Sequence, residues 1–289
     1  MNQKVFEKAA NFIWLNARLL ERYRFSYHFH HGSKSAVLTS LKAYQNPDGG
    51  FGNALEPDKR YPGSNAMDVM TAFYILDEIN AMDDPMVREA CDFLVSASTP
   101  EGGLPFTIPQ INSYPHSPWM GTDDPYPPAS INPTGDLVGL LLKHNVVHPW
   151  LEKAVPFCWQ AQDSTRDGFH DIMPAIEFLK YAPNRPLAEK MIGEIKQNIL
   201  IKKLVNFDRK TEGYLKFPLD WAPSPNHVFR SLFSDQKIKN DLDALVAMQQ
   251  DDGGWPINWP PLSKAVEMEW RGIRTLQILL TLRAYQYLS

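Results

Sequence analysis

Tryptophans and acidic side chains gather in three proline-rich stretches of the sequence. These stretches are SYPHSPWMGTDDPYPPASINP (113–133), FPLDWAPSPN (217–226) and WPINWPPLS (255–263). Their composition predicts long loops with apolar content, and such loops are often functional. Carboxylates held between apolar walls can act as general acids because burial raises the carboxyl pKa, and indole faces can stabilise positive charge. The stretches therefore predict acid chemistry or the binding of a cation.

The elements that must position these loops follow from an internal repeat. LKAYQNPDGGF (41–51) and LVAMQQDDGGW (245–255) share leucine, glutamine, paired glycines and a final aromatic at identical spacing, and weaker copies occupy 94–104, 158–169 and 204–214. Each copy follows a helical apolar pattern and precedes a loop and a second helix. The repeated unit is therefore helix, glycine turn, helix. Five units and one N-terminal helix over 4–21 predict about eleven helices and no convincing strand.

The residue choices in the turn have a physical explanation. Paired glycines can adopt positive φ at the end of a helix, which stops the helix and reverses the chain. The acids Asp48 and Asp252 can accept hydrogen bonds from nearby backbone amides. The glutamines Gln45 and Gln249 can bridge to backbone groups of a neighbouring repeat. We expect these motif residues to be structural and the chemistry to lie in the loops that follow them.

Composition narrows the class of protein. The chain has 289 residues, an apolar fraction of 44% and a net charge of -4, which allow a sizeable core and indicate no nucleic-acid surface. Its two cysteines are too few for a disulfide framework, and its first twenty residues carry charges that a secretory segment would not tolerate. We expect a soluble, cytoplasmic protein. No Gly-x-Gly-x-x-Gly or Walker loop occurs, so no nucleotide cofactor is expected.

The repeat resembles that of the terpenoid cyclase and protein prenyltransferase superfamily, whose cyclases, squalene-hopene cyclase among them, carry glutamine-tryptophan (QW) motifs. QQDDGGW (249–255) matches that motif well, and QNPDGGF (45–51) matches it with phenylalanine for tryptophan. The resemblance implies a single α/α toroid over residues 1–289, with concentric rings of helices around a central cavity. The same architecture is known in cyclases, prenyltransferases, polysaccharide-active enzymes and non-catalytic proteins, so the fold alone does not determine function.

In such a toroid, the loops after the glycine turns lie over one end of the cavity. The resemblance therefore implies an apolar cavity with an acidic, aromatic rim. The candidate catalytic residues are Asp123, Asp124, Asp68 and Asp136. The candidate substrate-binding residues are Asp58, Trp119, His170, Trp221, Trp255, Trp259, Glu267, Trp270 and Arg271.

The catalytic motifs of the superfamily are incomplete in this chain. Class II cyclases protonate an alkene or epoxide with the middle aspartate of Asp-x-Asp-Asp, and the nearest match is Gly121-Thr122-Asp123-Asp124. On this resemblance Asp123 is the proton donor, and a solvated turn acid is the alternative interpretation. No aspartate pair continues into the Asp-Asp-x-x-Asp motif that binds magnesium in class I enzymes.

Metal chemistry is not expected either. Prenyltransferases bind zinc through an Asp-x-Cys pair, and neither Cys91 nor Cys158 has an aspartate two residues before it. The histidines at 28, 30 and 31 fit no common ligand spacing. His170 with Asp171 can be an acid-base pair or the start of a helix.

Three functions remain open. The leading one is a terpenoid-cyclase-like enzyme in which Asp123 donates a proton, Asp124, Asp68 and Asp136 tune it, and tryptophans stabilise cations. The second is a glycan-active hydrolase or lyase that uses paired carboxylates and tryptophans at the same rim. The third is a non-catalytic binding protein on the same fold. The expected partner is a small molecule, either an isoprenoid or a glycan.

Overall fold

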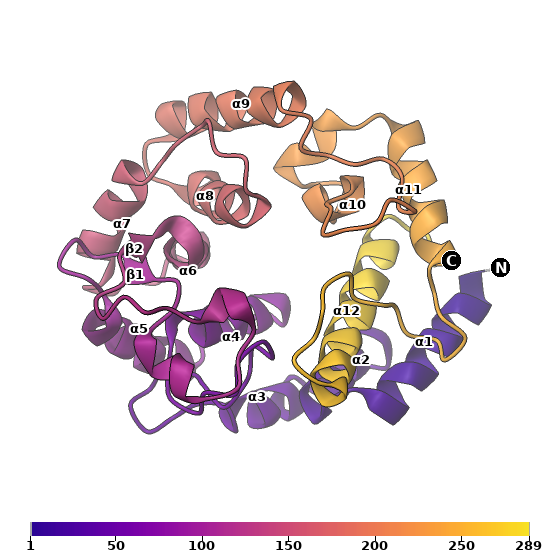
Figure 1. Ribbon diagram of the computed structural model, residues 1–289, viewed down its shortest axis with the longest axis horizontal. Helices are drawn as coiled ribbons and strands as arrows, with labels where there is room; N and C mark the ends of the chain where they lie inside the picture. The colour runs from indigo at the N-terminus through magenta and orange to yellow at the C-terminus, as the bar shows by residue number, and fades with distance from the viewer. Residues whose placement is uncertain (1, 289) are drawn as a thin grey trace. The chain divides into compact units, whose positions relative to one another are not determined.

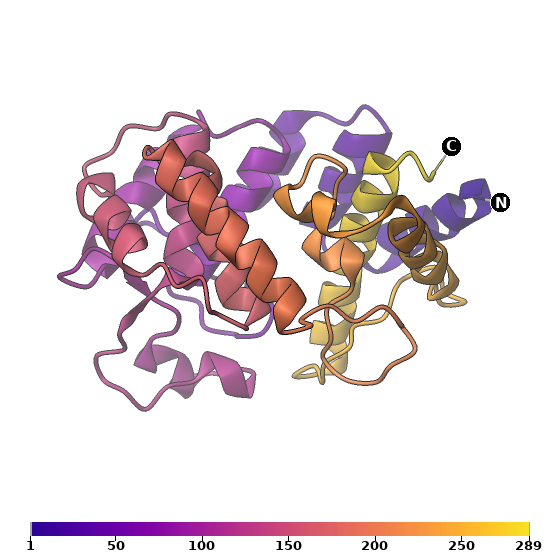
Figure 2. The same cartoon turned by 90° about the horizontal axis from the view of Figure 1, so that it is seen from above.

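The computed structural model describes residues 2–288 and has an all-α fold (Figures 1 and 2). This part of the chain forms twelve α-helices, and the only strands in it are two of two residues each. The α-helices are α1 (Asn2–Asn16), α2 (Leu19–Phe29), α3 (Lys34–Lys42), α4 (Ala66–Glu78), α5 (Pro85–Ala97), α6 (Ile131–Lys143), α7 (Leu151–Gln160), α8 (Phe169–Tyr181), α9 (Arg185–Ile201), α10 (Pro218–Trp221), α11 (Asp235–Ala247) and α12 (Lys264–Ala284). The all-α prediction is confirmed.

The chain divides into two compact units. Unit 1 comprises residues 2–37 and 199–288, and unit 2 comprises residues 38–198. The prediction of one closed toroid over residues 1–289 concerns both units together, so it stays a prediction.

Unit 2 is built around α6, which packs against α4, α7 and α8 and lies between α4 and α8 in Figure 1. Helices α6 and α8 approach closely because Gly135 and Gly139 of α6 lie directly against the backbone of Pro174 and Glu177. A β-carbon at either glycine would meet a carbonyl of α8, so the sequence requires glycine there. The buried face of α6 includes Leu137, which is 0% exposed.

Unit 1 is built around the C-terminal helix α12, which packs against α1 and α2, while α10 packs against α11. The helix expected over residues 4–21 is instead two helices that meet at Ala17 and Arg18. Arg18 has an extended backbone at the start of α2, and Arg22 Nε donates to the Ala17 carbonyl at 2.8 Å. The side chain thus satisfies a carbonyl at the break, which the apolar pattern alone does not reveal.

The glycine turns have the backbone conformation that the sequence predicts in four of the five copies. Positive φ occurs at Gly49 (85°), Gly102 (93°), Gly213 (110°) and Gly253 (92°). The fifth copy differs, because Gly168 has φ of -79° and precedes α8 directly. Its inserted residues allow a turn without the left-handed conformation.

The turn glutamines bridge between helix pairs as expected. Gln45 Nε2 donates to the Gly49 carbonyl at 2.7 Å and to the Met86 carbonyl of α5 at 3.4 Å. Gln249 Nε2 donates to the Val5 carbonyl of α1 at 2.9 Å. Each glutamine therefore connects its own turn to a helix of another helix pair, and these hydrogen bonds give it a structural role.

Candidate functional site

The most perturbed acid in unit 2 lies where α4 meets α6. The Tyr74 hydroxyl of α4 donates a hydrogen bond to Asp136 Oδ1 of α6. Asp136 is only 4% exposed, and burial raises its pKa from an ordinary 3.8 to about 7 although the bond from Tyr74 opposes the change. Burial and the nearby Asp136 carboxylate also raise the Tyr74 pKa. Asp136 is therefore a carboxyl group that is substantially protonated near neutral pH.

Charged side chains surround this pair. Glu177 of α8 raises the Asp136 pKa, and Lys180 lowers it. Glu177 and Lys180 form an ion pair of 2.7 Å with each other. Asp77, at the end of α4, pairs with Lys143 at 2.7 Å. The surroundings are polar, and Tyr74 as a residue is 40% exposed, so the pair lies at the edge of the core of unit 2.

Local sequence explains how Asp136 is placed. Ser130 caps α6, since its Oγ accepts from the Asn132 amide at 3.3 Å, and Thr134 Oγ1 donates to the Ser130 carbonyl at 2.7 Å. The peptide bond between Asn132 and Pro133 is cis. Asp136 then follows Gly135, whose missing side chain brings α8 close. The acid is buried because three helices converge on it.

A second group of buried charges lies before α4. Lys59 is 0% exposed, and its Nζ lies 3.0 Å from Glu56 Oε2 and 3.3 Å from Asp68 Oδ1. Asp68 Oδ1 also accepts from the Glu56 amide at 2.6 Å, and Asn65 Nδ2 donates to its other oxygen. Burial raises the Glu56 pKa from 4.5 to about 7, against the attraction of Lys59. Asp68 is thus held in an ion-pair network that fixes the loop.

Two predicted substrate-binding residues meet beside this network. Trp119 Nε1 donates to Asp58 Oδ2 at 3.1 Å. Asp58 is 5% exposed, whereas Trp119 is 41% exposed. The indole is therefore oriented by a buried carboxylate while much of its ring stays open to solvent.

The favoured proton donor Asp123 and its neighbour Asp124 are exposed. Asp124 Oδ1 accepts from the Tyr126 amide at 2.8 Å, which is a turn within the loop. His170 is also exposed, in the first turn of α8, with its ring against Phe169. The role of Asp123 stays a prediction.

Among the predicted residues of unit 1, two tryptophans are buried and one arginine forms an ion pair. Trp221 and Trp255 are both 1% exposed, and the Trp255 indole donates to the Leu245 carbonyl at 2.7 Å. Arg271 pairs with Asp252 of the glycine turn at 2.7 Å, so its charge is used within the fold.

The other three predicted residues of unit 1 lie on or before α12. Trp259 and Trp270 form an edge-to-face pair with ring centroids 5.2 Å apart. Glu267 pairs with Lys264 at 2.8 Å.

Three residues of the buried clusters were missed from the sequence, namely Tyr74, Lys59 and Glu177. Tyr74 fits the apolar pattern of a helix, and nothing in that pattern distinguishes a tyrosine that contacts an acid on another helix. Lys59 lies near acids in the sequence, but its burial depends on tertiary packing. All three residues escaped prediction because their contacts join elements that are distant in the sequence.

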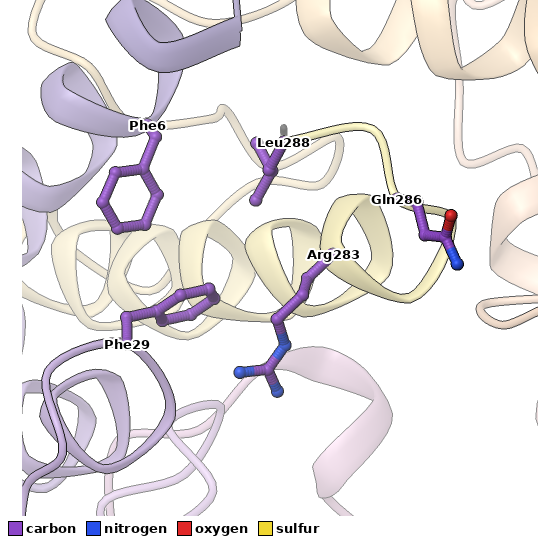
Figure 3. Close-up of a pocket in the computed structure, with 5 residues that line it drawn as sticks. All are labelled: Phe6, Phe29, Arg283, Gln286 and Leu288. Atoms are coloured by element: carbon purple, nitrogen blue, oxygen red, sulfur yellow. The ribbon is translucent and has the colours of Figure 1, made fainter.

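Two cavities of the described structure lie away from the candidate residues. One of about 490 Å³ in unit 1 is lined by Phe6, Phe29, Arg283, Gln286 and Leu288 (Figure 3). Another of about 550 Å³ in unit 2 is lined by residues between Val146 and Pro156. Residues 2–288 contain no cluster of three or more histidine, cysteine or acidic side chains able to hold a metal. They also contain no helix long and apolar enough to span a membrane.

Comparison with known proteins gives a fold relationship. No known protein family and no curated protein matches the sequence. A crystal structure of a protein from Actinoplanes matches with a TM-score of 0.60 and 14% identity, covering 99% of this chain and 100% of that one. The type II terpene cyclase MstE from Scytonema, in its apo form, matches with a TM-score of 0.56 and 13% identity at the same coverage. This chain therefore has a terpenoid-cyclase-like fold.

Proposed function

We propose that this protein is an enzyme in which Asp136 acts as a general acid on a small-molecule substrate. The observation that carries the proposal is the buried Asp136 carboxyl, bonded by Tyr74, with a pKa raised to about 7. A general acid is most effective when its pKa lies near the working pH, because it is then both protonated and able to release the proton. Perturbed acids of this kind concentrate at functional sites.

The leading substrate is an isoprenoid that carries an oxygen, such as a terminal epoxide. Asp136 would transfer its proton to the epoxide oxygen while the C–O bond breaks, which leaves a hydroxyl group, a carbocation and the Asp136 carboxylate. An acid with a pKa near 7 is better suited to an oxygen atom than to an alkene carbon, since oxygen is far more basic. The terpenoid-cyclase-like fold supports this substrate class.

Tyr74 is the positioning residue in this proposal. Its hydroxyl orients one oxygen of Asp136 and stabilises the carboxylate that remains after proton transfer. In Tyr74→Phe, the loss of this bond raises the Asp136 pKa further. The pH at which activity falls on the alkaline side of the profile should therefore be higher than in the wild type.

A glycan-active enzyme is the second candidate, and the polar surroundings of Asp136 favour it. Glu177 provides a second carboxylate, and Lys180 and Lys143 provide donors for hydroxyl groups. Glycoside cleavage needs one protonated and one ionised carboxyl. Asp136 and Glu177 would take these two roles.

One experiment separates the candidates. The protein is incubated with linear isoprenoids, their terminal epoxides and a panel of oligosaccharides, and the products are identified by mass spectrometry. Cyclised alcohols support the first candidate, cleaved sugars support the second, and no product with any of them contradicts both. Asp136→Asn should abolish the activity, whereas Asp251→Asn, at an exposed acid, should leave it unchanged. If Asp123→Asn abolishes it and Asp136→Asn does not, Asp123 is the donor.

A further inference from the structure

Unit 2 carries three solvent-exposed aromatic residues on one segment, and the proposed chemistry does not use them. The segment between β1 (Leu104–Pro105) and β2 (Ala129–Ser130) projects from the helices of this unit (Figure 2). Tyr114, Trp119 and Tyr126 in this segment are 39%, 41% and 89% exposed. We call these three residues the aromatic platform. Exposed aromatic groups on a rigid support are typical of interaction sites.

The support beneath the platform is rigid. The Ser117 amide donates to the Asp58 carbonyl at 2.7 Å, and the Arg60 amide donates to the Pro115 carbonyl at 2.8 Å. The Trp119 indole donates to the Asp58 carboxylate at 3.1 Å. These bonds tie the projecting segment to the loop that carries the Lys59 ion pairs. Trp119 therefore keeps one orientation in the free protein and loses little entropy when a ligand covers it.

A small hydrophobic cluster supports the same segment from below. Met67, Ile111 and Met120 are buried against one another, and Tyr61 and Phe106 pack on them. The rings of Tyr61 and Tyr114 meet edge to face with centroids 5.4 Å apart. The segment is thus a folded part of unit 2, and its outer aromatic rings are not part of this cluster.

The charge of this segment has one sign. Residues 89–142 contain no lysine or arginine, and Asp123 and Asp124 within the segment are exposed. Trp119 and Asp123 are four residues apart, so their α-carbons lie at most about 14 Å apart. Neighbouring side chains of one extended peptide can reach both. Aromatic faces and exposed carboxylates attract a cation.

We propose that the aromatic platform binds an arginine-rich segment of a partner protein. One guanidinium lies on the open face of Trp119, and a second pairs with Asp123 or Asp124. Arginine is favoured over lysine because its planar, weakly hydrated guanidinium stacks on an aromatic face and pairs with a carboxylate through two hydrogen bonds. Binding here does not depend on Asp136, so this proposal and the proposed function can fail separately.

The test uses the full-length protein and a fluorescein-labelled peptide of alternating arginine and glycine. Fluorescence anisotropy should show saturable binding that weakens as salt rises from about 50 to about 300 mM. Trp119→Ala should weaken binding at least about tenfold, and so should the double variant Asp123→Asn with Asp124→Asn. Trp14→Ala is the matched control, because Trp14 is 42% exposed but belongs to unit 1, and it should bind like the wild type.

Circular dichroism checks that each variant is folded. A second measurement on the protein with Trp119 in place means that the test does not rest on the Trp119→Ala variant alone. In 5-fluorotryptophan-labelled protein, the fluorine NMR signal of Trp119 should shift when the arginine peptide is added. It should shift much less with a peptide in which lysine replaces every arginine. The proposal is wrong if the arginine peptide does not bind, or if Trp119→Ala and Trp14→Ala bind it equally. It is also wrong if cellohexaose shifts the Trp119 signal and the arginine peptide does not.

Discussion

Replacing Asp136 by asparagine should make the stability of unit 2 less dependent on pH. The folded-state pKa of Asp136 is raised from 3.8 to about 7, so between these values the folded protein binds a proton that the unfolded chain has released. The stabilisation is complete below about pH 4 and is lost as pH rises through about 7. Asparagine has nearly the same shape, can accept the Tyr74 hydrogen bond and does not ionise.

The magnitude follows from the two pKa values. The difference between 3.8 and about 7 is about three pH units, and each corresponds to about 1.4 kcal/mol, which gives about 4 kcal/mol in total. About 2 to 3 kcal/mol of this falls between pH 5 and pH 8. Asp136 is 4% exposed, so solvent screening removes little of it. Glu56 also has a raised pKa, but it is present in both proteins and cancels in their difference.

Urea unfolding of the wild type and Asp136→Asn at about pH 5, 6, 7 and 8 measures this effect. The free energy of unfolding of the variant, relative to the wild type, should rise by about 2 to 3 kcal/mol over that range. Asp251→Asn, which removes an exposed acid, should show no such trend. A constant difference between Asp136→Asn and the wild type at every pH would refute the reasoning, because Asp136 would then ionise as it does in water.

Three further predictions concern the turns and the buried ion pairs. Gly253→Ala should lower stability more than Gly213→Ala does. Both glycines have positive φ, but of the two only Gly253 lies against the backbone of α1. Thermal unfolding of the two variants measures the difference. Gln249→Ala should lower the free energy of unfolding by about 1 to 3 kcal/mol because it leaves the Val5 carbonyl without this donor, and an unchanged urea midpoint would contradict this. Lys59→Met should cost about 3 to 5 kcal/mol near neutral pH, since two buried acids lose the cation between them, and the cost should shrink in acid as Glu56, whose pKa is raised by burial, becomes protonated.

The turns could be predicted from sequence because their interactions are mostly local. A glycine pair after a helix has few alternatives, and Gln45 and Gln249 each donate to the carbonyl of the glycine four residues later, at 2.7 and 2.9 Å. The break between α1 and α2 could not be predicted, since it depends on the bond from Arg22 to Ala17 and not on the apolar pattern.

The burial of the candidate residues follows less directly from the sequence. Motif similarity favoured Asp123, yet the structure leaves Asp123 exposed and buries Asp136, which the sequence ranked as a neighbour. Burial of Asp136 results from the contact of α6 with α4 and α8, and Tyr74 is 62 residues away in the chain. A single sequence does not encode such a contact in any local pattern. The motif tryptophan Trp255 is buried, and its indole donates to the Leu245 carbonyl, a contact that its spacing alone does not reveal.

The ionisation of Asp136 itself tests the account most directly. Carbon-13 NMR of the aspartate side-chain carboxyls, recorded over a pH series, follows each group, and the signal missing from Asp136→Asn identifies the one of interest. The account predicts that this carboxyl titrates near pH 7 and that Tyr74→Phe raises its midpoint further. A midpoint near the ordinary value of 3.8 would contradict the account, since Asp136 would then hold no proton to donate at neutral pH.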